Sequence, residues 1–176
     1  MGLTAPVVLE FDGPSESSGR GPLGGRRLSA VDGTFESRWE DRAISVLVVE
    51  DDPAMRLLVQ FNLEAAGFRV AVAETGTDGL EAAAVEKPDL VLLDVMLPDV
   101  GGFDVAERLR GVPIVFMSAR AAATDFTRGR EVGAIDYISK PFDPVALPAR
   151  LREDLIELEK SGSAAQVWAL RFGPSP

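Results

Sequence analysis

The sequence predicts an α/β fold with a doubly wound, five-stranded parallel sheet. Between residues 44 and 160, five short apolar runs alternate with five segments in which apolar residues recur at helical spacing. This alternation is typical of parallel strands joined by right-handed helical crossovers. One run, Leu90–Leu93, is apolar without interruption, which indicates a strand covered by helices on both faces. The strand order expected for such a chain is 2-1-3-4-5.

Four of the five expected strands run into a polar side chain. The strands are expected over residues 44–49, 68–73, 90–94, 113–117 and 135–139. The polar side chains at their ends are Asp51, Asp94, Ser118 and Lys140. Because parallel strands gather their carboxyl ends at one edge, where ligands bind, these four side chains are expected to meet there. The switch point falls between the first and third strands, so Asp51 and Asp94 flank the crevice.

The expected helices are marked by start and stop signals. Asp52 caps the first helix, Pro53 suits its first turn, and Gly67 closes it. Three further helices are expected over residues 77–86, 103–110 and 121–132. Asp143–Pro144 is expected to open the last helix, in which leucines at positions 147, 151, 155 and 158 share one face. Pro148 would then lie inside this helix and bend its start.

Composition divides the chain into three parts. Residues 1–43 are expected to be a disordered N-terminal extension, because the Gly-, Ser- and Pro-rich stretch 13–25 cannot offset chain entropy by burial. Residues 44–160 are long enough for one ordinary core and are expected to form a single domain. Residues 161–176 are too few for a second domain and are expected to be a C-terminal tail or the start of a linker.

The composition also excludes several classes of function. A net charge of -10 argues against nucleic-acid binding, because phosphate contacts need a basic face. The chain has no Cys and no His, which excludes thiol redox chemistry, thiolate metal sites and imidazole catalysis, so any metal is expected to have oxygen ligands. No apolar run has the length of a membrane span, and the N-terminus lacks the pattern of a signal peptide, which together predict a soluble cytoplasmic protein.

Four ordered motifs resemble the receiver domain of two-component response regulators, the CheY-like superfamily. They are Val48–Asp52, Leu92–Pro98, Met117–Arg120 and Asp136–Phe142, and the resemblance spans residues 44–160. It implies a flavodoxin-like (βα)5 fold and a two-component response regulator function. In that function, a histidine kinase or a phosphotransfer protein donates a phosphoryl group to Asp94, and the new state controls a partner protein.

The resemblance implies a role for each matching residue at the site. The implied Mg²⁺ ligands are Glu50, acting through water, Asp51, Asp94 and the backbone carbonyl of Met96. Ser118 would bond to the phosphoryl group, and Lys140 would pair with it. The peptide bond between Lys140 and Pro141 is implied to be cis, which aims the lysine.

Tyr137 matches the aromatic switch of the family. Once Asp94 is phosphorylated, Ser118 would be drawn toward the new acceptor oxygens. Tyr137 would then rotate inward into the vacated space and reshape the surface of the fourth helix, the fifth strand and the last helix. We expect Tyr137 to report the modification to a partner.

Elementary chemistry accounts for these residue types. Three carboxylates that converge at one sheet edge repel one another, and a hard divalent cation relieves the repulsion. Mg²⁺ prefers octahedral oxygen ligands and commonly binds one or two carboxylates together with phosphate. With the phosphate charge screened, Asp94 can attack in line while Lys140 and Ser118 neutralise the phosphoryl oxygens. The step needs positioning and charge rather than a base, so a chain without His can perform it with an outside donor.

Three hypotheses describe what the signal controls. The leading one is a single-domain receiver that acts on another protein or passes its phosphoryl group onward in a relay. The second is a receiver fragment of a winged-helix DNA-binding regulator, because Met96, Arg120 and the segment Leu170–Gly173 resemble that class. The third is a pseudo-receiver that never turns over phosphate. None of them is a conventional enzyme, and only self-phosphorylation from a phosphodonor and slow autodephosphorylation are expected.

The sequence departs from receivers that dimerise through three ion pairs on the fifth strand and the last helix. Asp136 and Arg150 fit one pair. The positions of the other two pairs, which would need matching charges, are occupied by Phe126, Ile135, Ala146 and Glu157. At most a weak homodimer is therefore expected, with neither a membrane nor a direct nucleic-acid partner.

Overall fold

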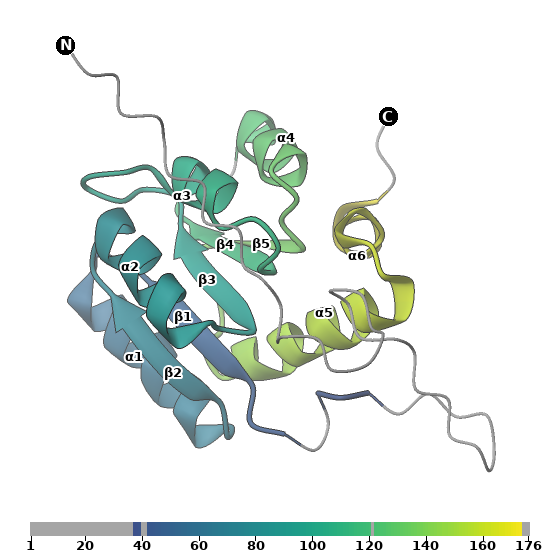
Figure 1. The fold of residues 1–176 in the computed structure, drawn as a ribbon. Helices are drawn as coiled ribbons and strands as arrows, with labels where there is room; N and C mark the ends of the chain where they lie inside the picture. The colour runs from purple at the N-terminus through teal and green to yellow at the C-terminus, as the bar shows by residue number, and fades with distance from the viewer. Residues whose placement is uncertain (1–36, 40–41, 121, 174–176) are drawn as a thin grey trace.

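The computed structural model describes residues 37–39, 42–120 and 122–173. Within them lies a wholly parallel sheet with the strands β1 (Ser45–Val49), β2 (Arg69–Ala73), β3 (Leu90–Asp94), β4 (Ile114–Ser118) and β5 (Asp136–Ser139). Their order across the sheet is β2-β1-β3-β4-β5, which confirms the predicted topology (Figure 1). The switch point lies between β1 and β3, where Val49 pairs with Leu93.

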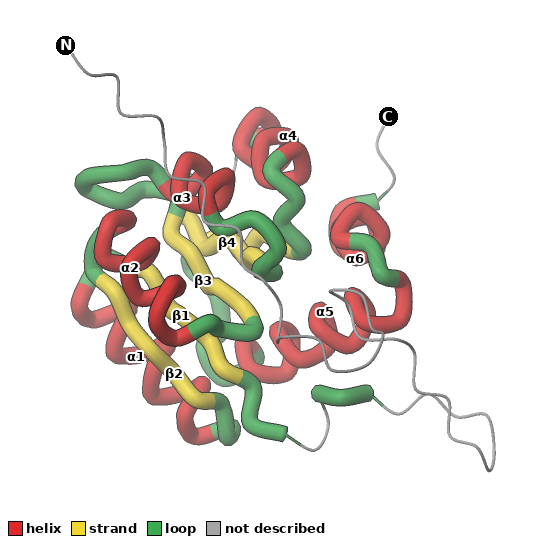
Figure 2. The backbone as a smooth tube through the Cα atoms, viewed as in Figure 1, coloured by secondary structure: helices red, strands yellow, loops and turns green. Residues whose placement is uncertain are grey.

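Helices cover both faces of the sheet. They are α1 (Pro53–Ala65), α2 (Gly76–Glu86), α3 (Gly102–Arg108), α4 (Ala123–Glu131), α5 (Leu147–Ser161) and α6 (Ala164–Phe172). α1 and α5 lie on one face, and α2, α3 and α4 lie on the other (Figures 1 and 2). Every residue of β3 is buried, as predicted for a strand covered on both faces. In the part of the chain that the structure describes, no helix has the length and apolar composition to cross a membrane.

The capping signals act as predicted at α1, whereas α5 begins later than expected. Asp52 accepts a hydrogen bond from the Met55 amide at 2.6 Å, and Pro53 occupies the first turn. α5 begins at Leu147 rather than at Pro144, which places Pro148 in its first turn. A proline in the first turn removes no helical hydrogen bond, so the reason for the predicted bend disappears.

A side chain upstream of the expected domain boundary belongs to the core. Trp39 is 3% exposed and packs in the cluster beneath α1 and α5. Its carbonyl accepts a hydrogen bond from Arg152 at 2.7 Å, which ties the chain before β1 to α5. The guanidinium groups of Arg38 and Arg42 lie 4.1 and 4.6 Å from the centre of its ring. Residues 1–36 and 40–41 of the expected extension lie outside the described residues.

Truncation of Trp39 is expected to be strongly destabilising. Removing a buried indole loses its transfer free energy and leaves a cavity, which costs about 3–5 kcal/mol of unfolding free energy. Urea denaturation of Trp39→Ala measures this loss, with Phe61→Ala as a matched control because the Phe61 side chain is 68% exposed. Equal midpoints for the two variants would contradict a structural role for the segment before β1.

Asp154, on α5, is a buried carboxylate with a perturbed pKa. Burial raises its pKa to about 7, repulsion from Asp136 adds to the rise, and the Arg171 guanidinium opposes it. The unfolded chain releases this proton near the ordinary value of 3.8, so between the two values the folded state binds more protons than the unfolded state. The stabilisation linked to this proton is complete below the unfolded pKa and is lost as the pH rises through the folded pKa.

Raising the pH from about 5 to about 8 is therefore expected to lower the stability of the wild type more than that of Asp154→Asn, by a few kcal/mol at most. Urea denaturation at both pH values measures the difference. The contributions of carboxylates that the two proteins share cancel when their pH dependences are compared. An identical pH dependence in the two proteins would show that Asp154 has an ordinary pKa.

Candidate functional site

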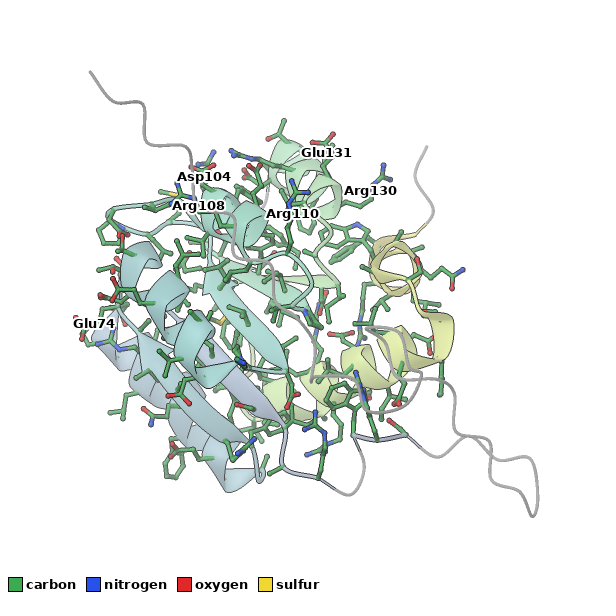
Figure 3. The ribbon with its side chains drawn as sticks, viewed as in Figure 1. Glu74, Asp104, Arg108, Arg110, Arg130 and Glu131 are labelled. Carbon is green, nitrogen blue, oxygen red and sulfur yellow. The ribbon has the colours of Figure 1, made fainter. Side chains whose placement is uncertain are left out.

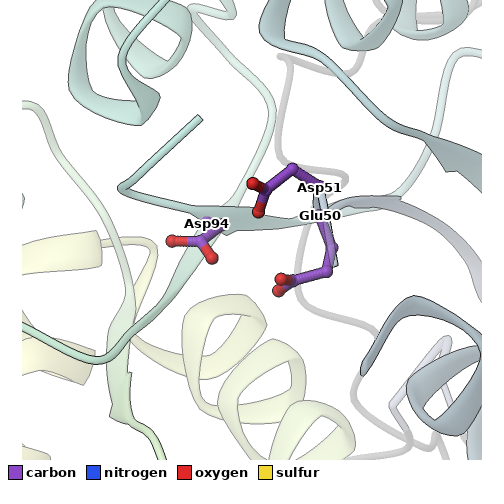
Figure 4. Close-up of side chains that lie close together, drawn as sticks. All are labelled: Glu50, Asp51 and Asp94. Atoms are coloured by element: carbon purple, nitrogen blue, oxygen red, sulfur yellow. The ribbon is translucent and has the colours of Figure 1, made fainter. Parts of the chain in front are cut away.

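Three acidic side chains gather at the carboxyl ends of β1 and β3. Glu50 and Asp51 follow β1 and Asp94 ends β3, so the pairing of these strands brings them together (Figure 4). One carboxylate oxygen from each lies within 4.8 Å of the others. Glu50 and Asp94 are buried, whereas Asp51 is exposed. The cluster is therefore open to solvent at Asp51 and can accept a cation there.

Lys140 lies between the two buried carboxylates. It follows β5, and its peptide bond to Pro141 is cis. Its ammonium nitrogen lies 2.6 Å from Glu50 Oε2 and 2.5 Å from Asp94 Oδ2. One ammonium group faces two buried carboxylates and the nearby Asp51, so the ionised site carries an excess of negative charge. That excess favours a second cation.

The pKa values of the buried groups reflect this charge balance. Burial raises the pKa of Glu50, the hydrogen bond from Lys140 opposes the rise, and repulsion from Asp94 adds to it. Burial by itself lowers the pKa of Lys140, but its hydrogen bonds to Asp94 and Glu50 outweigh burial and raise it. The ammonium group therefore stays charged and can pair with an anionic group that enters the site.

Ser118 and Tyr137 are linked through the backbone of Arg120. Ser118 is fully buried at the end of β4, beside β3, where Met117 pairs with Asp94. The Ser118 hydroxyl accepts a hydrogen bond from the Arg120 amide at 3.0 Å. The Tyr137 hydroxyl donates to the Arg120 carbonyl at 2.7 Å. If Ser118 moved toward a group on Asp94, the displacement would therefore be transmitted to Tyr137 through the backbone of Arg120.

The Tyr137 ring is already buried. It is 1% exposed and packs against Phe126, with the ring centres 4.5 Å apart. The switch expected from the sequence starts with a ring outside the fold that rotates inward. In this structure the ring therefore already lies inward.

The loop between β3 and α3 is fixed to two neighbours. The Met96 amide donates to Asp94 Oδ1 at 2.8 Å, although the Met96 side chain is exposed. Asp99 accepts hydrogen bonds from the amides of Gly76 and Thr77, at 2.8 and 2.9 Å, at the start of α2. The bond from the Thr77 hydroxyl, with those from the two amides, lowers the pKa of Asp99. Asp99 was not predicted from the sequence, because only the fold brings it to α2.

Arg56, on α1, supports the acidic loop from the helix that follows it. Its Nη1 donates to the backbone carbonyls of Glu50 and Asp51, at 2.8 and 3.2 Å. Its Nη2 pairs at 2.7 Å with Glu74, which follows β2 and is labelled in Figure 3. Arg56 was also missed in the sequence. An arginine one turn into a helix that follows an acidic loop is the signal that could have identified it.

Arg56→Lys is expected to weaken Mg²⁺ binding about tenfold, because residues that orient metal ligands typically contribute that much affinity. Lysine keeps the positive charge but lacks the rigid fork with which Arg56 holds the two carbonyls through Nη1 and Glu74 through Nη2. Calorimetric titration measures the affinity, with Arg69→Lys at an exposed position of β2 as the control. Equal Mg²⁺ affinities for the wild type and Arg56→Lys would show that Arg56 does not position the metal ligands.

Comparisons with known proteins place this geometry in a family. The model of the response regulator receiver domain matches residues 46–152. The transcriptional regulatory protein CseB of Streptomyces coelicolor is 43% identical over 140 residues, which are 73% of this chain and 60% of that protein. The DNA-binding response regulator MtrA of Mycolicibacterium smegmatis is 45% identical over 113 residues, which are 62% of this chain and 50% of that protein. The chain thus spans between half and three fifths of the length of these relatives.

Solved receiver domains have the same fold. The BeF3-activated receiver domain of DrrB gives a TM-score of 0.60 at 31% identity and covers 65% of this chain and 98% of its own. The BeF3-activated N-terminal receiver domain of Klebsiella pneumoniae RstA gives 0.59 at 39% identity and covers 63% of this chain and 97% of its own. With the family model matched over most of the sheet and its helices, the chain belongs to the response regulator receiver domain family.

Proposed function

We propose that the chain accepts a phosphoryl group on Asp94, with Mg²⁺, from a histidine kinase or a phosphotransfer protein in the cytoplasm. The observation that carries this proposal is the Lys140 ammonium between Glu50 and Asp94, beside an exposed third carboxylate. The site thereby offers carboxylates to a cation and an ammonium group to a phosphoryl oxygen. As a response regulator receiver, the chain is not a conventional enzyme, as the sequence predicted.

The donor set fits Mg²⁺. It consists of carboxylate oxygens, since the chain has no Cys or His, and oxygen is the ligand atom that Mg²⁺ prefers. Asp51 and Asp94 would hold the ion directly, Glu50 through water, and Met96 through its carbonyl. When bound, the ion supplies positive charge that screens the incoming phosphate.

Asp94 acts as the nucleophile. One of its carboxylate oxygens forms a bond to phosphorus while the bond from phosphorus to the donor breaks, and the donor leaves with the electron pair. The hydrogen bond from the Met96 amide orients the carboxylate. Lys140 exchanges its contact with Asp94 Oδ2 for a phosphoryl oxygen. Ser118 turns its hydroxyl toward another phosphoryl oxygen, and charge on the transferred group is thereby stabilised.

A second candidate function concerns the output of the receiver. The leading proposal is that phosphorylation changes the surface of α4, β5 and α5 and so controls a separate partner protein. The names of CseB and MtrA, a transcriptional and a DNA-binding regulator, favour the second hypothesis from the sequence, a receiver that serves a DNA-binding regulator. Sequencing the natural gene beyond the codon for Pro176 distinguishes these proposals: a stop codon favours the separate partner protein, and a continuing reading frame favours the attached DNA-binding domain.

Uptake of phosphate from acetyl phosphate tests the proposed function. Intact-mass spectrometry is expected to show the addition of one phosphoryl group in the presence of Mg²⁺ and none after chelation of the metal. Failure to take up phosphate from either acetyl phosphate or a phosphohistidine donor would contradict the proposal and favour the pseudo-receiver.

A further inference from the structure

α6 packs on the surface formed by α4, β5 and α5, hereafter the α4–β5–α5 face (Figure 1). Its buried residues, Val167 and Trp168, join the core clusters on opposite faces of the sheet, so the helix closes the sheet edge beside β5. Leu170 faces solvent and is 68% exposed. α6 is therefore an amphipathic helix with a defined seat on the receiver.

The seat of α6 is shaped around a glycine. Gly129, in α4, has no side chain where the Trp168 indole lies, and a β-carbon there would be 3.0 Å from Trp168 Cη2 and 3.4 Å from Tyr137 Cδ2. Phe172 makes an edge contact with Phe126 on α4, with ring centres 5.3 Å apart. Phe126 in turn packs on Tyr137. The aromatic residues of α6 thus cover Tyr137 and the α4 residues around it.

An ion pair holds the C-terminal end of α6. Arg171 Nε donates to Asp154 Oδ1 at 2.9 Å, and Arg171 Nη2 lies 3.3 Å from Glu153. The Asp154 side chain is 1% exposed, so undocking of α6 would separate a buried carboxylate from its cation. Undocking therefore forfeits a largely buried ion pair, and the carboxyl group has to take up a proton or become hydrated. Apolar packing and charge therefore specify the same docked position.

Tyr137 belongs both to the seat of α6 and to the phosphoryl site. Ser118 Oγ accepts from the Arg120 amide, and the Arg120 carbonyl accepts from the Tyr137 hydroxyl. Phe126 packs on the Tyr137 ring, and Trp168 lies in the same buried cluster beside Gly129, so the docked α6 adds contacts that favour the inward position of the ring. The docked α6 and the inward Tyr137 therefore stabilise each other.

We propose that the α4–β5–α5 face is the binding surface of α6, and that docking of α6 and phosphorylation of Asp94 favour each other because both require Tyr137 inward. The coupling rests on the proposed function, whereas the docking does not. By linkage, docked α6 strengthens the binding of a non-covalent phosphoryl mimic by the same factor by which the bound mimic stabilises docked α6. A second copy of the chain, or a partner helix, has to displace α6 before it can use this face.

Two measurements on the full chain test the proposal. Hydrogen exchange reports the protection of the α6 amides, and fluorine NMR titration with beryllofluoride and Mg²⁺ reports affinity for a phosphoryl mimic. Trp168→Ala removes the main contact, and Leu170→Ala is the matched control on the exposed side of the helix. Beryllofluoride is expected to raise α6 protection in the wild type, and Trp168→Ala to lower both α6 protection and mimic affinity, the affinity about fivefold. Leu170→Ala is expected to change neither.

Gly129→Ala provides a second variant if Trp168→Ala fails to fold. The added methyl favours helix formation in α4 but presses on Trp168, so it is expected to lower α6 protection and mimic affinity in the same direction. Unchanged protection of the α6 amides in both folded variants would overturn the docking.

The remaining outcomes separate the two parts of the proposal. If α6 is undocked in a variant and beryllofluoride binds that variant as tightly as the wild type, or more tightly, the coupling is overturned and the docking of α6 stands. Absence of beryllofluoride binding in the wild type would overturn the acceptor role of Asp94 and the coupling with it, while the exchange data still decide the docking. Beryllofluoride could instead make the wild type dimerise while the α6 amides lose hydrogen-exchange protection. That result would show that a second copy of the chain, rather than α6, occupies the α4–β5–α5 face, and it would overturn the proposal.

Discussion

Asp94→Asn is expected to abolish phosphoryl uptake from acetyl phosphate under conditions in which the wild type gains one phosphoryl group. The amide has no anionic oxygen to form the bond to phosphorus, so the reaction loses its nucleophile rather than a supporting contact. The side chain keeps nearly the same volume, and its single oxygen can still accept a hydrogen bond from the Met96 amide or from the Lys140 ammonium, which contact different oxygens of Asp94. Intact-mass spectrometry measures the loss.

The control for this variant is Asp78→Asn, which removes an exposed carboxylate from the first turn of α2, away from the acidic cluster. It is expected to be phosphorylated like the wild type. Full uptake by Asp94→Asn, with the phosphoryl group found at another aspartate, would contradict the assignment of Asp94.

Lys140→Ala is expected to change phosphoryl uptake and Mg²⁺ affinity in opposite directions. Loss of the ammonium removes a charge that stabilises the phosphoryl oxygens, which lowers the rate of uptake about 100-fold. It also leaves the buried carboxylates of Glu50 and Asp94 without their counter-ion. A divalent cation then has more negative charge to neutralise, so Mg²⁺ is expected to bind more tightly.

Rates of phosphoryl uptake at saturating Mg²⁺ and calorimetric Mg²⁺ titrations measure the two effects of Lys140→Ala. Lys160→Ala, at the end of α5 and outside the acidic site, is the control for lysine removal. A parallel loss of uptake and Mg²⁺ affinity would point to disruption of the whole site and would contradict the separate role of Lys140.

The sheet and the acidic cluster could be predicted because both depend on local patterns. Apolar runs mark the strands, and parallel strands place the residues at their ends on one edge. The same logic predicts that Asp51, Asp94 and Lys140 meet at one edge, and the structure brings them together. The order of the strands also followed from the alternation with helices.

The contacts that could not be predicted depend on distant neighbours. Trp39 follows a stretch without periodicity, and nothing local shows that Arg152 and the core beneath α5 receive it. Residues 161–176 were expected to be a tail or the start of a linker, and the binding position of Trp168 exists only because Gly129, in another helix, leaves space. The start of α5 was placed too early because Asp143–Pro144 also carries a helix-start signal.

Mn²⁺ in place of Mg²⁺ tests the central claim most directly, because a paramagnetic ion broadens the NMR signals of the residues around it. The proposed site predicts that the amide signals of Asp51, Asp94 and Met96 broaden first and recover when excess Mg²⁺ is added. Broadening centred elsewhere in the chain, or broadening at these residues that Mg²⁺ fails to reverse, would contradict a magnesium site built from the ends of β1 and β3.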